Sequence, residues 1–297
     1  MITLRQLKYF DAVVKLGHFG KAAEHCAVTQ PALSMQIQNL EAGLGVQLLE
    51  RGPNGVIATA IGREIATRAT KILGDVQDLD DYARHGNNLL SGELNLGVIP
   101  SVAPYILPQL LGVLRKSYPA LDLHIRETQT DNLIDELLAG KLDLLLLALP
   151  LERNINDFAT QALFDDNFVL AIPRNQQLSG KVVASPELMG GKNMLLLEEG
   201  HCLRDQTIAY CKLQQTGNLS TQGASSLSTL VQMVANGMGI TLLPEMSLEV
   251  ETRNQNIKIL RFDNPQPNRK IGLAWRITSP RSDDFIELGK LLAMNHI

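Results

Sequence analysis

The spacing of apolar residues changes twice along this chain of 297 residues, and each change marks a different kind of structure. Residues 1–58 show the three-to-four-residue spacing of short amphipathic helices, and residues 59–90 continue it in one long stretch. Residues 91–297 alternate short apolar runs with amphipathic stretches, which is typical of alternating strands and helices. We therefore expect a mainly α N-terminal domain, a long linker helix and an α/β C-terminal domain.

Three helices and a hairpin are predicted within residues 1–58. Apolar spacing fits a first helix over 4–16, a second over 19–26, and a third that opens at Thr29 or Gln30 with Pro31 in its first turn, where proline is tolerated. A Pro-Asn-Gly turn then predicts a hairpin over 48–56, a wing that could place Arg51 against DNA. This is the layout of a winged helix–turn–helix.

The third helix has one apolar face and one face of short hydroxyl and amide side chains. Leu33, Ile37 and Leu40 recur at helical spacing and should pack inward. Amide and hydroxyl groups on the other face suit base edges in a major groove. A small helical domain with an uncommitted polar surface remains the alternative. The candidate DNA-contacting residues are Thr29, Gln30, Pro31, Ser34, Gln36 and Arg51.

The long helix predicted over 59–88, within a linker and hinge segment over 59–90, has a seam of apolar residues like that of a coiled coil, which favours dimerisation over packing on its own domain. A dimer would present two DNA-binding heads to a site of two-fold symmetry. The seam comprises Ile61, Ile65, Ala69, Ile72, Val76, Leu79 and Ala83.

Residues 91–297 are expected to form two subdomains with largely parallel sheets. Subdomain I would comprise 91–165 and 268–297, and subdomain II would comprise 166–267, with crossings near 164–167 and 263–269. In such folds ligands bind in the crevice at the carboxyl ends of the strands.

Two cysteines, Cys202 and Cys211, lie nine residues apart in a segment predicted as a helix. Nine helical residues rise about 13.5 Å, whereas a disulfide requires Cα atoms within about 7 Å. The helix and a disulfide between these residues exclude one another, so the segment is a candidate redox switch. Two ordinary buried cysteines are the alternative.

Different roles are predicted for the two thiols. Cys202 stands at the helix N-terminus beside His201 and Arg204, which should favour its thiolate and make it the group that an oxidant attacks. Cys211, near the other end, would resolve the sulfenic acid. Cys26 falls in an apolar pattern and is expected in a core.

The predicted crevice brings hydroxyl groups to this thiol. Helices are expected to begin after Ser101 and at Thr130, and their N-termini should face Cys202. With His201 and a cation, the two hydroxyls would form a small polar pocket able to hold a peroxide. Plain helix capping is the alternative role for both.

Composition limits the class of protein. Net charge is −4, and the first 90 residues carry nine basic and nine acidic side chains, so DNA binding must rest on pattern rather than on charge. The longest apolar run is too short to span a membrane, no secretory signal is evident, and no metal-ligand spacing or cofactor motif is present. We expect a cytoplasmic protein without cofactor or metal, in which a disulfide would be regulatory.

The residues resemble a known family, the LysR-type transcriptional regulators. The resemblance is carried by TQPALSMQIQNLE over 29–41 and LLER over 48–51. GHCLRDQ over 200–206, with Cys211 beyond it, resembles the peroxide-sensing branch, the OxyR type. The resemblance to this family implies a winged helix–turn–helix and a regulatory domain similar to periplasmic binding proteins. It also implies a transcriptional activator in the oxidative stress response, working as a homotetramer with double-stranded DNA and RNA polymerase.

The resemblance also implies site roles. Cys202 would be the peroxidatic thiol, and Cys211 its disulfide partner. Serine stands at 101, where the family usually has threonine, and this keeps the hydroxyl. Hydrogen peroxide would be held by Ser101, Thr130, His201 and Arg269, with Asp205 and Gln206 nearby. A LysR-type regulator responding to a small anionic metabolite in the cleft is the alternative, and a thiol peroxidase is disfavoured.

Overall fold

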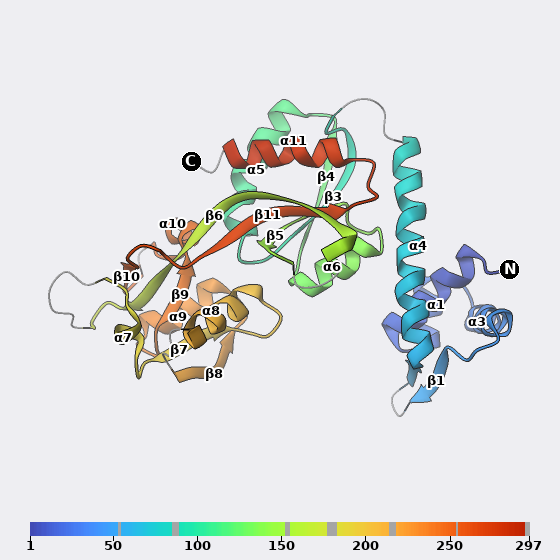
Figure 1. Cartoon of the computed structure of the whole chain (residues 1–297), viewed down its shortest axis with the longest axis horizontal. Coiled ribbons are helices and arrows are strands. Elements are labelled where there is room, and N and C mark those ends of the chain that lie inside the picture. Colours follow the sequence, from blue (N-terminus) through green and yellow to red (C-terminus); the bar gives the residue numbers. More distant parts are fainter. Residues whose placement is uncertain are drawn as a thin grey trace. The chain divides into compact units, whose positions relative to one another are not determined.

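A computed structural model shows regular helices and strands along most of the chain (Figure 1). The structure describes residues 1–52, 55–84, 89–151, 155–176, 183–213, 218–253 and 255–294. These residues form two units, one built mainly on residues 1–84 and the other on the residues beyond. A helical unit with a hairpin and a long helix, together with an α/β unit, confirms the predicted fold class.

The helices of the first unit begin and end where the sequence supplies caps. Thr3 and Gln6 form a capping box at the start of α1, and Gly17, with φ +63°, ends it. Thr29 is the residue before α3, and Pro31 lies in its first turn, as expected. The elements are α1 (Leu4–Leu16), α2 (Phe19–His25), α3 (Gln30–Leu44), β1 (Leu49–Gly52), β2 (Gly55–Ala58) and α4 (Ala60–Arg84).

The predicted inward face of α3 forms the centre of the first unit's core. Leu33, Ile37 and Leu40 are buried against Phe10 of α1, and the half-buried Cys26 packs on the same cluster. Because these positions recur at helical spacing, sequence pattern alone located this core correctly.

The apolar residues of α4 divide between two environments. Ala69 is buried and Ile65 packs against the core of the same unit, so that part of the predicted seam is internal. Further along the helix, Val76 is exposed, and Leu79 and Tyr82 are 68% and 71% exposed. The seam is therefore split: Ile65 and Ala69 pack internally, whereas its other described residues are exposed and could meet a partner, namely Ile61, Ile72, Val76 and Leu79. Residues 85–88 lie outside the described residues.

The second unit is built on one seven-stranded sheet in the order β10-β6-β11-β5-β3-β4, with β9 paired to β6, and on the smaller pair β7-β8. The longest apolar run of the sequence, Leu144–Leu149, lies at the centre of this sheet as β5 and is buried along almost its whole length. The strands are β3 (Gly92–Val98), β4 (Leu121–Glu127), β5 (Leu144–Leu149), β6 (Phe158–Pro173), β7 (Asn193–Leu197), β8 (Asn218–Ala224), β9 (Thr241–Pro244), β10 (Ile257–Arg261) and β11 (Asn268–Arg276).

The helices of the second unit include α8, which begins at Cys202 as predicted. Helices were also expected to begin after Ser101 and at Thr130, and α5 and α6 begin at Ala103 and Thr130, whereas the short α7 and α10 were not predicted. The helices are α5 (Ala103–Ser117), α6 (Thr130–Leu138), α7 (Pro186–Met189), α8 (Cys202–Leu213), α9 (Leu227–Ala235), α10 (Leu248–Glu251) and α11 (Ser282–Met294), with 3-10 turns η1 (Ile155–Asp157) and η2 (Glu245–Ser247).

The expectation of largely parallel sheets is wrong at the centre of this unit. β3 pairs in parallel with β4 and β5, but β11 is antiparallel to both β5 and β6. β6 is one continuous strand of 16 residues, pairing with β11 through its first part and with β9 and β10 through its last. The crossing expected near 164–167 is thus a strand, and β6 and β11 form a two-stranded ribbon along it (Figure 1).

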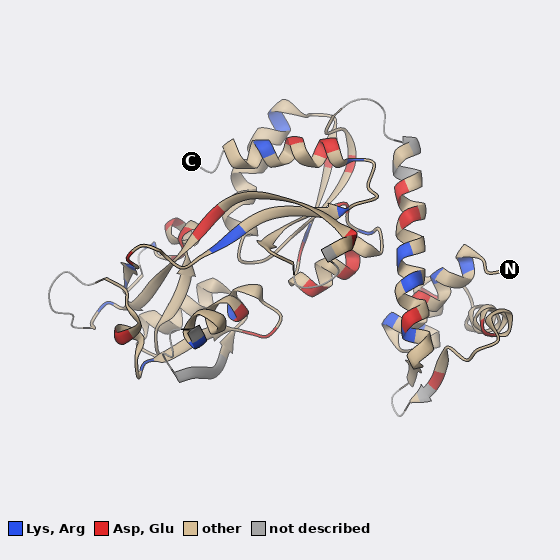
Figure 2. Ribbon diagram, viewed as in Figure 1, with Lys and Arg blue, Asp and Glu red and all other residues tan. Residues whose placement is uncertain are grey.

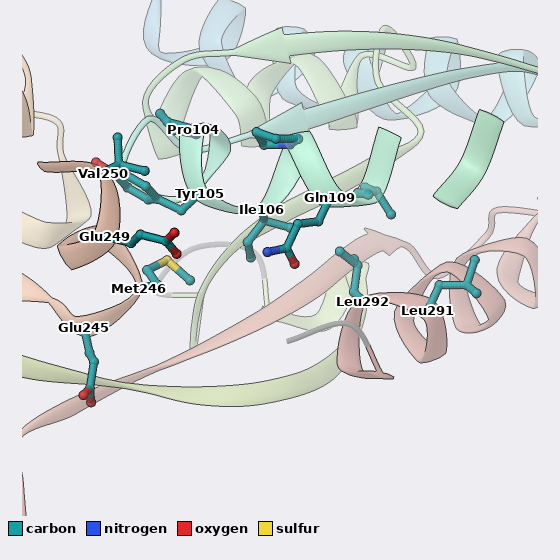
Figure 3. Close-up of a pocket in the computed structure, with 12 residues that line it drawn as sticks. Pro104, Tyr105, Ile106, Gln109, Glu245, Met246, Glu249, Val250, Leu291 and Leu292 are labelled. Atoms are coloured by element: carbon teal, nitrogen blue, oxygen red, sulfur yellow. The ribbon is translucent and has the colours of Figure 1, made fainter. Parts of the chain in front are cut away.

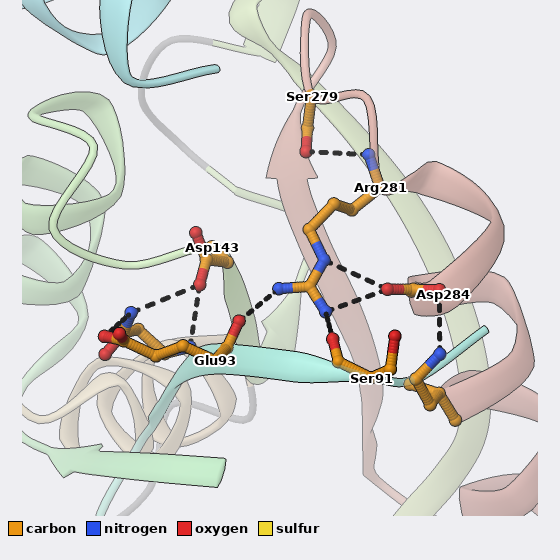
Figure 4. A network of polar contacts seen from close by, with 8 residues as sticks. Ser91, Glu93, Asp143, Ser279, Arg281 and Asp284 are labelled. Atoms are coloured by element: carbon orange, nitrogen blue, oxygen red, sulfur yellow. Dashed lines mark hydrogen bonds and ion pairs between the residues drawn. The ribbon is translucent and has the colours of Figure 1, made fainter. Parts of the chain in front are cut away.

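A buried ion pair fixes the start of the second unit to its last helix (Figure 4). The Arg281 guanidinium pairs with Asp284 at 2.8 Å and donates to the backbone carbonyls of Ser91 and Glu93. Asp284 also accepts from the Leu90 backbone N–H at 3.0 Å. The chain segment that enters β3 is therefore held by a salt bridge with almost no solvent exposure.

Within the described part of the chain, no helix combines the length and hydropathy needed to cross a bilayer.

Replacing Asp284 by Ala should lower the free energy of unfolding of the second unit by about 3–5 kcal/mol, because the Arg281 charge stays buried without its partner. Urea denaturation measures this. Asp283→Ala is the matched control, since Asp283 is exposed in the same helical turn. Equal destabilisation by the two substitutions would contradict the role given to the ion pair.

Candidate functional site

The exposed face of α3 offers uncharged hydrogen-bonding groups. Thr29, Gln30 and Pro31 are exposed at its start, and Ser34 and Gln36 are half-exposed. The single charged residue of α3, Glu41, accepts the backbone N–H groups of Leu48 and Leu49 at 2.7 and 3.1 Å. Figure 2 shows no cluster of Lys or Arg along this helix. Its chemistry suits base edges better than phosphates.

Arg51 lies on β1, but its side chain is outside the described part of the structure. The predicted contact of this wing residue with DNA remains a prediction.

In the second unit, four predicted site residues line one small pocket. Ser101 follows β3, Thr130 begins α6, and His201 and Cys202 stand at the start of α8. Ile99, Pro100, Gln129 and Gly200 complete the pocket, which in this state is too tight to admit a water-sized molecule. Residues separated by a hundred positions in the sequence therefore converge on one thiol.

The turn before Cys202 requires glycine. Gly200 has φ +90°, and a Cβ atom there would lie 2.4 Å from Oε1 of Gln129. The Gln129 amide in turn donates to the Glu199 carbonyl at 3.1 Å. This close approach brings the start of α6 to the start of α8 and so sets the width of the pocket.

Arg269 reaches the pocket from β11 by way of Ser101. Its Nη1 donates to the Ser101 hydroxyl at 2.7 Å and its Nη2 to the Ser101 carbonyl at 2.9 Å. Its Nε pairs with Asp166 at 2.9 Å, and both side chains are almost fully buried. Arg269 is thus the cation of this site, and its positive charge opposes the rise that burial causes in the pKa of Cys202.

Arg204 does not have the role expected from its position near Cys202. Its guanidinium donates to the Leu197 carbonyl at 2.9 Å. Residues two apart on a helix point in different directions. Arg204 is therefore not the cation beside the Cys202 thiol, although it lies close to Cys202 in the sequence.

The pKa of Cys202 is shifted opposite to our expectation. Burial raises the pKa of this thiol, and this outweighs the lowering by Arg269, by the Thr130 hydroxyl and by the Leu203 N–H; Asp205 raises it further. Burial also lowers the pKa of His201, so its imidazole is neutral near pH 7. The resting site holds a protonated thiol rather than a thiolate.

Neither Ser101 nor Thr130 acts as a helix cap. Val102 precedes α5 without a side-chain cap, and the Ser101 hydroxyl oxygen instead accepts from Arg269. The Thr130 hydroxyl is buried and has no hydrogen-bond partner of ordinary geometry among the described residues. It still lies close enough to the Cys202 sulfur to oppose the rise in the pKa of that thiol. The capping alternative is therefore wrong, and both hydroxyl protons remain available to a ligand.

Asp205 and Gln206 face a second, larger cavity on α8. This cavity of about 360 Å³ also borders Cys202 and Thr130, and Asp131 lies across it. Oε1 of Gln206 is buried without a partner among the described residues. Its described lining includes two aspartates and no Lys or Arg. The cavity suits a small neutral polar molecule better than an anion.

Cys211 lies in an apolar cluster rather than in the pocket. It is buried with Met194, Leu196 and Phe262, and burial raises the pKa of its thiol. Both Cys202 and Cys211 are free thiols on an intact α8. Helix geometry places them about 13.5 Å apart along the axis.

Sequence analysis missed two groups of polar residues. Asp166 is 103 positions from Arg269, and only the pairing of β6 with β11 brings them together. The Tyr105 hydroxyl donates to Glu251 at 2.8 Å, and Ser228 donates to the same carboxylate at 2.7 Å, linking α5, α9 and α10. No local signal marks either group.

A cavity of about 420 Å³ lies beside this link (Figure 3). Figure 3 shows Tyr105, Met246 and Glu249 together at one end of it. The Met246 sulfur also lies 3.5 Å from Nη2 of Arg269, so this cavity adjoins the same buried guanidinium.

Gly200→Ala should lower the free energy of unfolding of the second unit and slow alkylation of Cys202, because the new methyl group displaces Gln129. Gly191→Ala is the control: Gly191 has φ +68° but open space around its missing Cβ. The free energy of unfolding of Gly191→Ala should fall by only about 1–2 kcal/mol, which is the cost of a non-glycine residue in the left-handed conformation. Calorimetry and iodoacetamide labelling measure the two effects, and similar behaviour of both variants would refute the packing role.

Two family models match this chain. The model of the LysR substrate binding domain matches residues 87–292, and that of the bacterial regulatory helix-turn-helix protein, lysR family, matches residues 4–63.

The chain is also similar to curated and solved proteins along almost its whole length. A probable hydrogen peroxide-inducible genes activator of Streptomyces viridosporus is 42% identical, with 98% of this chain and 93% of that protein covered. Full-length OxyR of Pseudomonas aeruginosa, with an aspartate replacing a cysteine, superposes with TM-score 0.74 at 34% identity, covering 99% and 98%. A cysteine-to-serine mutant of Corynebacterium glutamicum OxyR, described as H2O2-bound, gives TM-score 0.67 at 33% identity, covering 98% and 92%.

Proposed function

The chain belongs to the LysR family of bacterial transcriptional regulators, with OxyR-type hydrogen peroxide-inducible activators as its relatives, and we propose that Cys202 is the group through which it senses hydrogen peroxide. The observation that carries this proposal is the set of unused donors around that thiol. The Ser101 and Thr130 hydroxyls and one Nη1 N–H of Arg269 have no acceptor among the described residues.

Peroxide fits these donors because both of its oxygens accept hydrogen bonds. With the oxygens held by Ser101, Thr130 and Arg269, the Cys202 sulfur attacks one of them. The S–O bond forms as the O–O bond breaks, and the second oxygen leaves with the thiol proton as water. Sulfur is oxidised to sulfenic acid and peroxide is reduced. The donors stabilise the charge that develops on the leaving oxygen.

Cys211 then completes the switch. Its sulfur attacks the sulfenic sulfur of Cys202. An S–S bond forms as the S–O bond breaks, and the hydroxyl leaves with the Cys211 thiol proton as water. The two Cα atoms must approach within about 7 Å, so α8 has to unwind. Cys211 also has to leave its apolar cluster, which repacks Ile208, Tyr210 and Phe262. The disulfide form is therefore a different packing of subdomain II.

DNA binding follows from the family, and its details belong to the proposal. The start of α3, from Thr29 to Ser34, would enter the major groove, with Arg51 on the wing. The exposed second half of the α4 seam would pair two chains, placing two domains over 1–58 on a two-fold site. A homotetramer that contacts RNA polymerase, with 59–90 as linker and 91–297 as regulatory domain, completes the assembly.

A regulator of anionic metabolites is disfavoured by the charge of the cleft. Asp131 and Asp205 line the cavity beside Cys202, and its described lining contributes no Lys or Arg. An anion there would lose hydration without gaining a counter-ion among the described residues of the lining.

Treatment of the reduced protein with a slight excess of hydrogen peroxide should form a disulfide between Cys202 and Cys211, detected by peptide-mapping mass spectrometry. Cys202→Ser should abolish the peroxide response of DNA binding, Cys211→Ser should consume one peroxide without forming this disulfide, and Cys26→Ser should behave as wild type. A full response in Cys202→Ser would refute the proposal. Thermal shifts caused by anionic metabolites in a chain lacking both cysteines would favour the alternative.

Gln30→Ala should weaken binding to the specific operator by about 1–3 kcal/mol while leaving non-specific affinity unchanged, because a side-chain amide reads a base edge. Titration by fluorescence anisotropy at fixed salt measures both. Thr67→Ala, at an exposed position of α4, is the control. Equal loss on specific and non-specific DNA would assign Gln30 to the phosphates instead.

A further inference from the structure

Asp166 is a buried carboxylate that faces the cation of the peroxide site from behind. It lies on β6 directly opposite Arg269 in the antiparallel register, and its Oδ2 is 2.9 Å from Nε of that residue. The side chains are 2% and 0% exposed. A buried ion pair of this kind is held in one geometry, because either charge alone would be strongly unfavourable.

The remaining donors of Arg269 are directed at Ser101 and Met246. Nη2 donates to the Ser101 carbonyl and to the Met246 sulfur, and Nη1 donates to the Ser101 hydroxyl. One N–H of Nη1 is left without a partner among the described residues. The planar guanidinium has a fixed fork geometry, so the Nε contact with Asp166 determines where this last N–H points.

Asp166 is itself fixed on its other oxygen. Its Oδ1 accepts from the Met246 backbone N–H at 3.2 Å, so the carboxylate receives one donor on each side. An asparagine could satisfy only one of them, because its amide would place a donor against either Arg269 or Met246. The site therefore requires a carboxylate at 166 for its shape as well as its charge.

We propose that Asp166 is the positioning residue of the peroxide reaction: it aims the Arg269 guanidinium at Ser101 and the pocket, and its charge limits the field of Arg269 at Cys202. This inference deepens the function proposed above and rests on it. The charged groups around Cys202 are Arg269 on β11, Asp205 on its own helix and Asp131 on α6, with Asp166 behind Arg269. His201, beside Cys202, is neutral.

Two opposite effects follow from Asp166→Asn. The charge of Arg269 is no longer offset, so the Cys202 thiolate is favoured and alkylation by iodoacetamide should begin at lower pH. The guanidinium loses its fixed aim, so the rate constant for peroxide should fall on the order of tenfold to a hundredfold. A residue with only a structural role would slow both reactions together.

The experiment uses the full-length chain with Cys211 and Cys26 replaced by Ser, so that only Cys202 reacts. Peroxide oxidation and the pH profile of iodoacetamide labelling are followed by mass spectrometry, with thermal unfolding as a check on folding. Asp165→Asn is the matched control, because Asp165 is the preceding residue and forms an exposed ion pair with Lys270 at 2.7 Å. It should leave both reactions unchanged.

A second background keeps the test decisive if Asp166→Asn is poorly folded. Arg269→Gln with Asp166→Asn removes both buried charges, and its peroxide rate should equal that of Arg269→Gln alone, because Asp166 acts through Arg269. An unchanged peroxide rate in Asp166→Asn, a parallel loss of both reactions, or a further loss in the double variant would each overturn the inference. If Cys202 of the parent chain did not react with peroxide, the proposed function would fail instead.

Discussion

The buried charge of Arg269 is the constraint on which the arrangement of the second unit depends. A guanidinium without solvent needs a carboxylate and enough acceptors, and it finds them in Asp166 on β6, Ser101 after β3 and Met246 in η2. Satisfying one cation therefore fixes the β6–β11 ribbon, the loop before α5 and the turn that follows β9. The same bonds leave one N–H of Arg269 and the hydroxyl proton of Ser101 without an acceptor among the described residues, so the packing requirement also supplies donors beside the pocket of Cys202.

The second constraint is the length of α8. A helix holds Cys202 in the polar pocket and Cys211 in an apolar cluster, and no helical geometry joins them. The thiol form is thus stabilised by burial of Cys211, Ile208 and their neighbours, and a disulfide between the two cysteines would have to compensate for the loss of that packing. A switch of this kind has two well-separated states because protein cores are close-packed and do not deform continuously. The redox state would be transmitted as a repacking of one cluster.

Whether the sequence predicted a feature correctly depends on how far apart in the chain its interacting residues lie. Helical spacing located α1, α3 and α8, because their cores depend on residues three and four apart. The first part of β6 was missed, since residues 158–167 alternate in exposure and pair only with the distant β11. Position in the chain suggested Arg204 as the cation beside Cys202, and only the family resemblance pointed to Arg269, which folding brings to Ser101 from 168 positions away. The direction of the Cys202 pKa was wrong for the same reason: local sequence suggests charges, whereas burial is set by the whole fold.

A raised thiol pKa is compatible with a sensor, and it explains how such a site would remain quiet until its signal arrives. A protonated, buried thiol is a poor nucleophile toward most electrophiles. Aspartates line the neighbouring cavity, which disfavours anionic oxidants. A small neutral molecule with two acceptor oxygens would satisfy the donors of Ser101, Thr130 and Arg269 and place an oxygen beside the sulfur at the same time. The negative charge of attack would then develop only where the Arg269 field and the α8 N-terminus stabilise it. On this argument the selectivity arises from unused hydrogen-bond donors, and the reactivity of the thiol depends on the ligand that fills them.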